Sequence, residues 1–351
     1  MVLPRDPYLA GFKVGTSQKE AVRELVREYY QKGLAAHGGP GRIAVKRAVG
    51  RARAAASWAV KEEIRGLADA TGLPERLLWA ANIAVDLYSG SSLMACSVVV
   101  APRQDGGFLV GRNLDFFDFG VLHKHTVLLV RPRGRAGWTA SLGWPGLVGI
   151  LTGWNDRGEF CSLNLGFDDS GRCTDVKALP ALFMIRRVLE SQAPPSRKIA
   201  WLRKQPPSFP MILCFADSKG GAIIEKSASG GKVRRLKTGA AYAANHMLGW
   251  GGSMGARCRT LQGLAAQHAV TREALEETLR KVTLGSSLSQ SFCTLYSVVF
   301  NPKTGEAWVA DGLLPATRGP YRKIVMPERM ERDESRYPAG RRGTIHHPRV
   351  P

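Results

Sequence analysis

A cysteine, an arginine and an aspartate stand at spacings that could assemble a nucleophilic site. Cys96 opens the apolar segment 97–102, and Arg112 and Asp115 lie at the end of a second apolar segment, 106–115. If the two segments pair as a β-hairpin, the end of the second returns beside the start of the first. A cysteine beside an arginine has the electropositive setting that favours the nucleophilic thiolate. The spacing therefore predicts a reactive thiol at Cys96 flanked by Arg112 and Asp115.

The same residues also fit a plainer interpretation, in which Cys96 is a buried thiol and the Asn-Leu-Asp sequence at 113–115 forms a turn. The chain has six cysteines, none in a CxxC pair, and most are expected to be small buried hydrophobes. No cluster of metal ligands accompanies them, so no metal and no other cofactor is expected. The pair His346-His347 is interpreted as part of a solvated end.

The elements that must hold these residues fall into two regions. The first 95 residues predict helices, and Ser17 and Glu20 have the spacing of a capping box at a helix start. The HGGPG sequence at 37–41 predicts a break, and a further helix is expected over about 74–88. The small-residue run 89–92 predicts a flexible turn just ahead of the cysteine.

After Cys96, short apolar runs separated by Gly, Asp, Asn and Pro predict strands. The expected strands are 97–102, 106–115, 126–132, 159–167, 210–217, 220–227, 294–301 and 306–311. Amphipathic helices are expected near 178–192 and near 257–282. Antiparallel strands with helices inserted in blocks predict a layered α+β fold. Residues 317–351, rich in Arg and Pro, predict an extended tail.

The sequence MACSVVVAP followed by GRNLDFF resembles the processed start of a group of N-terminal-nucleophile (Ntn) hydrolases. The group comprises the penicillin acyltransferase-like and choloylglycine-hydrolase-like families, with acid ceramidase and N-acylethanolamine amidase among them. In these families a cysteine is exposed by autocleavage, and an Arg or Gln and an Asp follow at the two offsets seen here. The resemblance implies cleavage between Ala95 and Cys96, with Arg112 and Asp115 in the site.

Three further stretches match these families in chain order, so that the resemblance covers about residues 80–313. GWNDRGEFCSLNLGF resembles the stretch that supplies a first oxyanion-hole residue, here Asn164, and YAANHM the strand that supplies a second, here Asn245. ARCRTLQGL resembles the start of a helix whose arginine corresponds to Arg257, although a shifted alignment would select Arg259. TLYSVVFNPKTGEAWVADG resembles the closing hairpin of the families.

The resemblance implies a four-layer αββα sandwich, in which two antiparallel sheets lie between helical layers. It divides the chain into a helical pro-segment or α-subunit (1–95), a catalytic β-subunit (96–316) and a basic tail (317–351). It also implies an α/β heterodimer made from one chain by self-cleavage. The expected reaction is hydrolysis of the C–N bond of N-acyl amides through an acyl-enzyme. Acyl transfer from acyl-CoA at the same site is the alternative.

Elementary chemistry explains why such a site needs no histidine. A free cysteine, with a pKa of about 8.5, is only a few per cent ionised at pH 7. Cleavage before Cys96 would create an α-amino group with a pKa of about 7.7–8.0, which can accept the thiol proton. Arg112 would favour the thiolate, and Asp115 would orient the new ammonium group. The side-chain amides of Asn164 and Asn245 would stabilise the oxyanion, where losing one donor costs about 2.7–4 kcal/mol.

The net charge of +21, from 50 Lys and Arg against 29 Asp and Glu, bears on possible partners. The excess is spread along the chain and no nucleic-acid-binding motif accompanies it, so no nucleic acid is expected as a partner. A dispersed positive charge suits acidic ligands, which leaves a non-catalytic polyanion-binding protein as an alternative from another class. No apolar run is long enough to span a membrane, and the first residues lack a secretory signal, so a cytoplasmic location is expected.

A serine hydrolase is a further alternative, because residues 251–255 satisfy G-x-S-x-G around Ser253. That motif acts at a strand-to-helix elbow with acid and histidine partners, for which Asp311 and His346 are the candidates. The surrounding antiparallel pattern does not favour it. No residue selects the acyl group, although the phenylalanines beside Asp115 (Phe116, Phe117 and Phe119) could line an apolar pocket or belong to the core.

Overall fold

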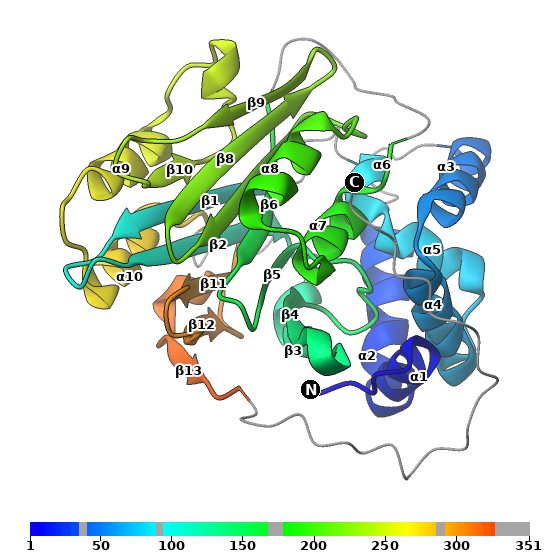
Figure 1. The fold of residues 1–351 in the computed structure, drawn as a ribbon. Coiled ribbons are helices and arrows are strands. Elements are labelled where there is room, and N and C mark those ends of the chain that lie inside the picture. The colour runs from blue at the N-terminus through cyan, green and yellow to red at the C-terminus, as the bar shows by residue number, and fades with distance from the viewer. Residues whose placement is uncertain (35–40, 89–93, 168–177, 286–291, 327–351) are drawn as a thin grey trace.

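Two antiparallel β-sheets lie face to face at the centre of the molecule, with helices against their outer faces (Figure 1). The computed structural model describes residues 1–34, 41–88, 94–167, 178–285 and 292–326. The run predicted as a turn at 89–92, His346-His347 and most of the predicted tail lie outside these residues.

The first sheet carries the hairpin that was predicted around Cys96. Its six strands follow the order β10-β1-β2-β11-β12-β13. They are β1 (Met94–Pro102), β2 (Phe108–Phe117), β10 (Ala241–Ala243), β11 (Phe292–Phe300), β12 (Ala307–Asp311) and β13 (Arg322–Ile324). The edge strand β13 falls within the stretch predicted as an extended tail, so that prediction is wrong at its start. Its pairing with β12 supplies backbone hydrogen bonds that a free tail would lack.

The second sheet is a meander of seven strands in chain order, β3 to β9. They are β3 (Val127–Pro132), β4 (Trp138–Gly143), β5 (Thr152–Asn155), β6 (Phe160–Leu165), β7 (Met211–Asp217), β8 (Gly220–Ser227) and β9 (Gly230–Arg234). Central strands such as β6 and β7 are buried almost throughout. Both faces of the sheet are covered, which is why β7 is an almost continuous apolar run, whereas β6 carries the buried polar residues Ser162 and Asn164.

Helices complete the outer layers of this sandwich. α9 (Ala256–Ala265) and α10 (Arg272–Lys281) pack on the first sheet, and α7 (Ala181–Glu190) and α8 (Pro195–Lys204) pack on the second. The stretch near 257–282 that was predicted as helical forms two helices, because the hydroxyl of Thr271 accepts from the Ala274 N–H and starts α10 anew. The four layers confirm the α+β prediction and the αββα arrangement.

The helical block, defined here as residues 1–88, packs beside the sandwich (blue to cyan in Figure 1). It comprises α1 (Pro7–Ser17), α2 (Lys19–Glu24), a π-helix (Leu25–Leu34), α3 (Arg42–Ala55), α4 (Trp58–Thr71), α5 (Glu75–Asn82) and α6 (Ala84–Tyr88). The predicted capping box is wrong, since Ser17 ends α1 and its hydroxyl donates to the Lys13 carbonyl. Asp6 caps α1, with proline at the first helical position.

A buried ion-pair cluster joins the helical block to the sandwich. Glu63, on α4, lies 2.8 Å from Arg131 of β3 and 2.7 Å from Arg186 of α7, and all three side chains are buried. Burial alone would raise the pKa of Glu63, but the two guanidinium groups outweigh it and hold the pKa below its usual value. The block also lends Val2 to the edge of the second sheet, where it bridges Val130 in parallel.

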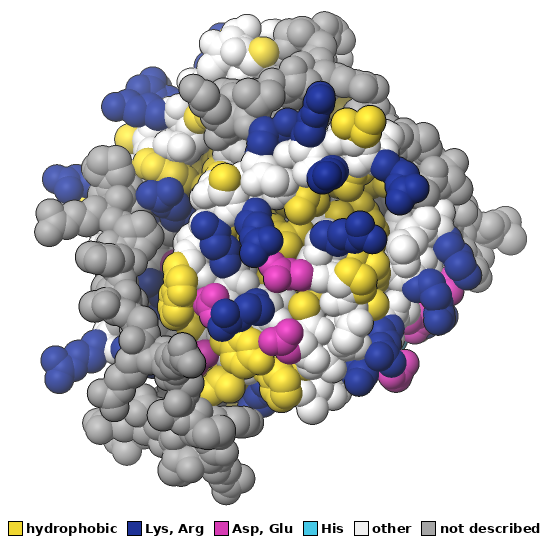
Figure 2. Space-filling view, turned by 90° about the vertical axis from the view of Figure 1, so that its right-hand side faces the viewer, with side chains coloured by type: hydrophobic (Ala, Val, Ile, Leu, Met, Phe, Trp, Pro, Cys, Tyr) yellow, Lys and Arg dark blue, Asp and Glu magenta, His cyan; other side chains and the backbone are white. Residues whose placement is uncertain are grey.

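The surface of the helical block shows how the positive charge is distributed. Lys and Arg side chains are scattered over this face among apolar and acidic ones (Figure 2).

Short 3-10 turns at Leu122–His125, Gly134–Ala136, Leu248–Trp250 and Ala316–Arg318 connect other elements. Within the described ranges, no helix is long and apolar enough to cross a membrane.

Candidate active site

The β1–β2 hairpin brings the predicted residues together on two faces of one sheet. Cys96 pairs with Leu114, and Ala95 pairs with Asp115. Because neighbouring residues of a strand point to opposite faces, Cys96 and Arg112 face the second sheet, whereas Asp115 faces α9. The thiol and the carboxylate therefore lie on opposite faces of the first sheet.

Arg112 is a fully buried guanidinium aimed at the thiol. Its Nη2 lies 3.4 Å from Cys96 Sγ and donates to the Leu163 carbonyl at 2.6 Å. Its Nε donates to Thr152 Oγ1 at 2.7 Å, and its Nη1 donates to Asn164 Oδ1 at 2.6 Å. These contacts from the second sheet fix the plane of the guanidinium group, so its position against the sulfur is set before any substrate arrives.

Burial favours the neutral form of the Cys96 thiol. Its side chain has no exposed surface, and this burial raises the pKa of the thiol above its usual value. The positive charge of Arg112 acts in the opposite direction and favours the thiolate. The uncut chain thus contains a nucleophile with its cation in place but without an adjacent amine.

Asp115 is the second buried charge of the site. Arg257 Nη1 lies 2.9 Å from its Oδ2, and Thr294 Oγ1 donates to its Oδ1 at 2.6 Å. Burial raises the pKa of Asp115 to about 6, although both partners favour the carboxylate. The group therefore titrates close to neutrality.

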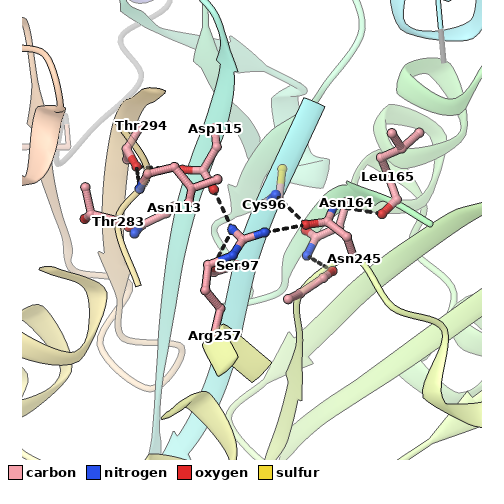
Figure 3. A network of polar contacts seen from close by, with 12 residues as sticks. Cys96, Ser97, Asn113, Asp115, Asn164, Leu165, Asn245, Arg257, Thr283 and Thr294 are labelled. Atoms are coloured by element: carbon pink, nitrogen blue, oxygen red, sulfur yellow. Dashed lines mark hydrogen bonds and ion pairs between the residues drawn. The ribbon is translucent and has the colours of Figure 1, made fainter. Parts of the chain in front are cut away.

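Arg257, at the start of α9, connects the Asp115 carboxylate to Asn245 (Figure 3). Besides Asp115, it contacts Ser97 Oγ at 3.3 Å and donates to Asn245 Oδ1 at 2.9 Å. Arg259, the alternative from a shifted alignment, donates to the Met254 carbonyl near the surface. The geometry thus selects Arg257 of the two arginines.

The two asparagines adjoin Cys96 with their amide groups already engaged. Asn245 Oδ1 accepts from the backbone N–H of Cys96 at 3.2 Å, and its Nδ2 donates to the Leu165 carbonyl. The Nδ2 of Asn164 donates to the Ala244 carbonyl. Each NH₂ group has two hydrogens, so each retains one donor beyond these contacts.

Three site residues escaped the sequence reasoning: Thr152, Thr294 and Tyr296. Thr294 contacts Asp115, and the Tyr296 hydroxyl donates at 2.8 Å to Thr152, the residue that holds Arg112. Isolated threonines and tyrosines within apolar strands carry no spacing signal. No feature of the sequence alone could have identified them.

The rival motif around Ser253 lies in a different setting. Residues 251–255 connect a 3-10 turn to α9, and the strand before them, β10, is antiparallel to β1. Asp311 on β12 faces Arg322 at 3.7 Å, and His346 lies outside the described residues. The parallel strand-to-helix elbow that this motif requires is not formed here.

Among the described residues, no group of three or more metal-ligating side chains is present.

An apolar cavity of about 90 Å³ lies between the helical block and the sandwich, on the Cys96 side of β2. Its walls are mostly large apolar side chains, among them Leu25, Tyr29, Leu78, Phe116, Trp144 and Leu151. Phe116 faces the same side of β2 as Arg112, two residues beyond the pairing partner of Cys96. Phe117 and Phe119 instead stack on each other. Of the three phenylalanines considered, Phe116 lines this cavity.

Known proteins share this architecture and sequence pattern. Residues 102–312, more than half of the chain, match the family "Acyl-coenzyme A:6-aminopenicillanic acid acyl-transferase". The chain is 29% identical over 146 residues to the N-acylethanolamine-hydrolyzing acid amidase of Caenorhabditis elegans. That alignment covers 38% of this chain and 41% of the relative, so it spans less than half of the relative's length.

Two solved structures are similar in fold. A Caenorhabditis elegans N-acylethanolamine-hydrolyzing acid amidase ortholog has a TM-score of 0.50 at 21% identity, covering 66% of this chain and 100% of that one. Penicillin V acylase from Agrobacterium tumefaciens has a TM-score of 0.47 at 15% identity, covering 63% and 84%. The two facing antiparallel sheets between helices are the fold that this chain shares with the amidase ortholog. The chain belongs to the acyl-coenzyme A:6-aminopenicillanic acid acyl-transferase family.

Proposed function

We propose that the chain cuts itself between Ala95 and Cys96 and then acts as a cysteine amidase on N-acyl amides with an apolar acyl group. One observation carries the proposal: Arg112 Nη2 lies 3.4 Å from Cys96 Sγ, while the backbone N–H of Cys96 donates to Asn245 Oδ1. A nucleophile and its own backbone nitrogen thus each have a dedicated partner. That arrangement suits a site whose base is the α-amino group released by cleavage.

In the cleavage step, Cys96 Sγ attacks the carbonyl carbon of Ala95. A C–S bond forms as the peptide C–N bond breaks, and the thiol proton ends on the departing nitrogen. Water then hydrolyses the thioester, which gives a carboxylate at Ala95 and regenerates the thiol. Asp115, opposite Ala95 in the ladder, lies where it can orient the released ammonium group.

In the amidase reaction, the free α-amino group accepts the proton of the Cys96 thiol, and the thiolate attacks the substrate carbonyl. The remaining N–H donors of Asn164 and Asn245 are candidates for stabilising the oxyanion. The amine leaves with the proton, and water releases the acyl group from sulfur. Arg112 favours the thiolate throughout, since its contacts with the second sheet hold it against the sulfur.

The cavity behind Phe116 supports an apolar acyl group. Phe116, on the face of β2 that carries Arg112, lines it, and its other walls come from both the helical block and the sandwich. A relative over part of the chain is an N-acylethanolamine-hydrolyzing acid amidase, which is consistent with a fatty acyl amide. We therefore propose a lipid-like N-acyl amide as the substrate class.

Acyl transfer is the second candidate, favoured by the description of the matching family as an acyl-coenzyme A-dependent transferase. The same acyl-enzyme would be loaded from a thioester and released to an amine. Product analysis with an acyl-CoA, with and without an amine acceptor, separates the two reactions. Consumption of the amine acceptor with formation of its N-acyl product and release of free CoA favours transfer, whereas release of free fatty acid from an N-acyl amide alone favours hydrolysis.

Intact mass after purification tests the cleavage directly. The expected result is two fragments, the second beginning at Cys96, and one uncut chain for Cys96→Ala. The wild-type product is then assayed on N-acyl amides, with Ser253→Ala as the matched control that should retain activity. A wild-type chain that stays at 38.2 kDa under all conditions and shows no hydrolysis would overturn the proposal. Salt-sensitive polyanion binding by the same protein would then favour the non-catalytic alternative.

A further inference from the structure

The strand β11 contains an irregularity at the centre of the site. Thr294 pairs with Asp115, and Tyr296 pairs with the neighbouring Leu114, so Leu295 is an extra residue without a partner on β2. This is a β-bulge, which changes the side to which the following residues point. In a regular strand Thr294 and Tyr296 would share one face.

The bulge sends the two side chains to opposite faces of the sheet. Thr294 points to the helical side, where its hydroxyl donates to Asp115 Oδ1 at 2.6 Å. Tyr296 points to the second sheet, where its hydroxyl donates to Thr152 Oγ1 at 2.8 Å. Thr152 in turn accepts from Arg112 Nε at 2.7 Å. One strand thereby contacts Asp115 directly through Thr294 and contacts Arg112 through Thr152.

We propose that β11 is a two-sided positioning strand, in which the bulge at Leu295 lets Thr294 orient Asp115 while Tyr296, through Thr152, orients Arg112. The inference rests on the proposed function, because it assigns these hydroxyls to the cleavage and amidase site. Neither residue touches the reacting atoms in this role. Each acts through the charged residue that it holds.

The hydrogen-bond directions support this assignment. The backbone N–H of Leu284 donates to Thr294 Oγ1 at 3.1 Å, so the hydroxyl hydrogen is left to point at Asp115. Burial raises the pKa of Tyr296 to about 12, so the phenol remains a neutral donor at any working pH. Both hydroxyls are buried, and water does not compete for them.

The first test measures the titration of Asp115 itself, which needs no catalytic turnover. NMR of the intact Cys96→Ala protein, labelled at the aspartate carboxyl carbons, follows the Asp115 signal, which Asp115→Asn identifies. Thr294→Val should raise the Asp115 titration midpoint by about one pH unit, because the carboxylate loses its donor. Thr294→Ser should restore the midpoint, and Tyr296→Phe should leave it unchanged.

The matched control is Thr283→Val, which removes a hydroxyl that bonds to the Leu279 carbonyl and to Thr317. If Thr294→Val moves the midpoint no more than Thr283→Val does, the assignment of Thr294 is overturned. That result stands whether or not the wild type cleaves, so it is separate from failure of the proposed function.

The second test uses the rate of Ala95–Cys96 cleavage as a function of pH, followed by intact mass. Thr294→Val should move the acid limb of this profile to higher pH. Tyr296→Phe should lower the rate about tenfold at every pH without moving the limb. The assignment of Tyr296 is overturned if Tyr296→Phe is cleaved at the wild-type rate. It is also overturned if the Cys96 thiol of this variant is alkylated at the wild-type rate.

Discussion

Asp115 lies directly opposite Ala95 in the β1–β2 ladder, although its side chain and that of Cys96 point to different faces of the sheet. On the face that carries α9, the Asp115 carboxylate forms an ion pair with Arg257 at 2.9 Å. Its charge state is set by that setting, since burial raises the pKa of Asp115 to about 6.

The pH dependence of cleavage follows from this pKa. Below about pH 6 Asp115 is protonated and no longer stabilises an ammonium group at Cys96. We expect the cleavage rate to fall as pH decreases through this value, with Asp115→Asn slow at every pH. Intact mass after incubation from pH 4 to 8 provides the measurement, and a rate that rises steadily to pH 4 would contradict it.

Asp115 should also lower the stability of the fold near neutrality. A carboxyl whose pKa is raised in the folded state contributes its stability below the unfolded pKa and loses it as pH rises through about 6. In a Cys96→Ala background, Asp115→Asn should therefore raise the free energy of unfolding at pH 7.5 by on the order of 2 kcal/mol. Urea unfolding at pH 7.5 and pH 4 tests this, and a gain of equal size at both values would contradict it.

Arg112 is expected to be needed as an arginine, not merely as a cation. Arg112→Lys keeps the charge but loses the fork that donates to Thr152, Asn164 and the Leu163 carbonyl. We expect a hundredfold or larger loss of cleavage and a destabilisation of about 3 kcal/mol, because buried acceptors lose their donors. Cleavage kinetics and urea unfolding provide the two measurements. Wild-type kinetics in Arg112→Lys would show that the fork is dispensable.

The cavity behind Phe116 should set the preferred acyl length. Ala81 lines it, and Ala81→Phe would fill part of its volume. We expect KM for long-chain N-acyl amides to rise about tenfold while short-chain substrates are little affected. Ala54→Phe, at an exposed position on α3, is the matched control. Equal effects on short and long chains would place the acyl group elsewhere.

If the chain is cut as proposed, Glu63 should keep the helical block attached to the sandwich. Glu63→Gln removes the charge between Arg131 and Arg186, and breaking a buried ion pair typically costs about 3–5 kcal/mol. We expect the two fragments of this variant to separate on size-exclusion chromatography under mild denaturant. Glu62→Gln, which affects a partly exposed pair with Arg65, is the control and should keep them together.

The part of the site that was predictable from residues alone is the local part. Cys96, Arg112 and Asp115 belong to two strands that are adjacent in the chain and form a hairpin. Because side chains alternate between the two faces of a strand, their spacing in the sequence predicts which of them lie close together. Asn245 lies 149 residues from Cys96 in the chain, and only the resemblance connected the two. The bulge at Leu295 is a backbone irregularity without a sequence signal, which is why Thr294 was missed.

Some helix ends were predicted wrongly because two local sequence signals competed. Ser17 and Glu20 fit a capping box, but α1 starts at the Asp6 cap and runs through Ser17, whose hydroxyl donates to the Lys13 carbonyl instead of capping a helix. Near 257–282 the apolar periodicity continues across a break that the Thr271 cap determines. In both places the pattern indicated a helix correctly and its ends incorrectly.

The Glu63 cluster has a consequence for refolding if the chain is cut between Ala95 and Cys96 as proposed. In the uncut chain one continuous backbone tethers the helical block to the sandwich, so refolding is expected to be independent of protein concentration. Once the Ala95–Cys96 bond is gone, the same contacts join two separate polypeptides. Recovery from denaturation would then be a second-order encounter that depends on protein concentration, so dilution alone would make unfolding irreversible in practice.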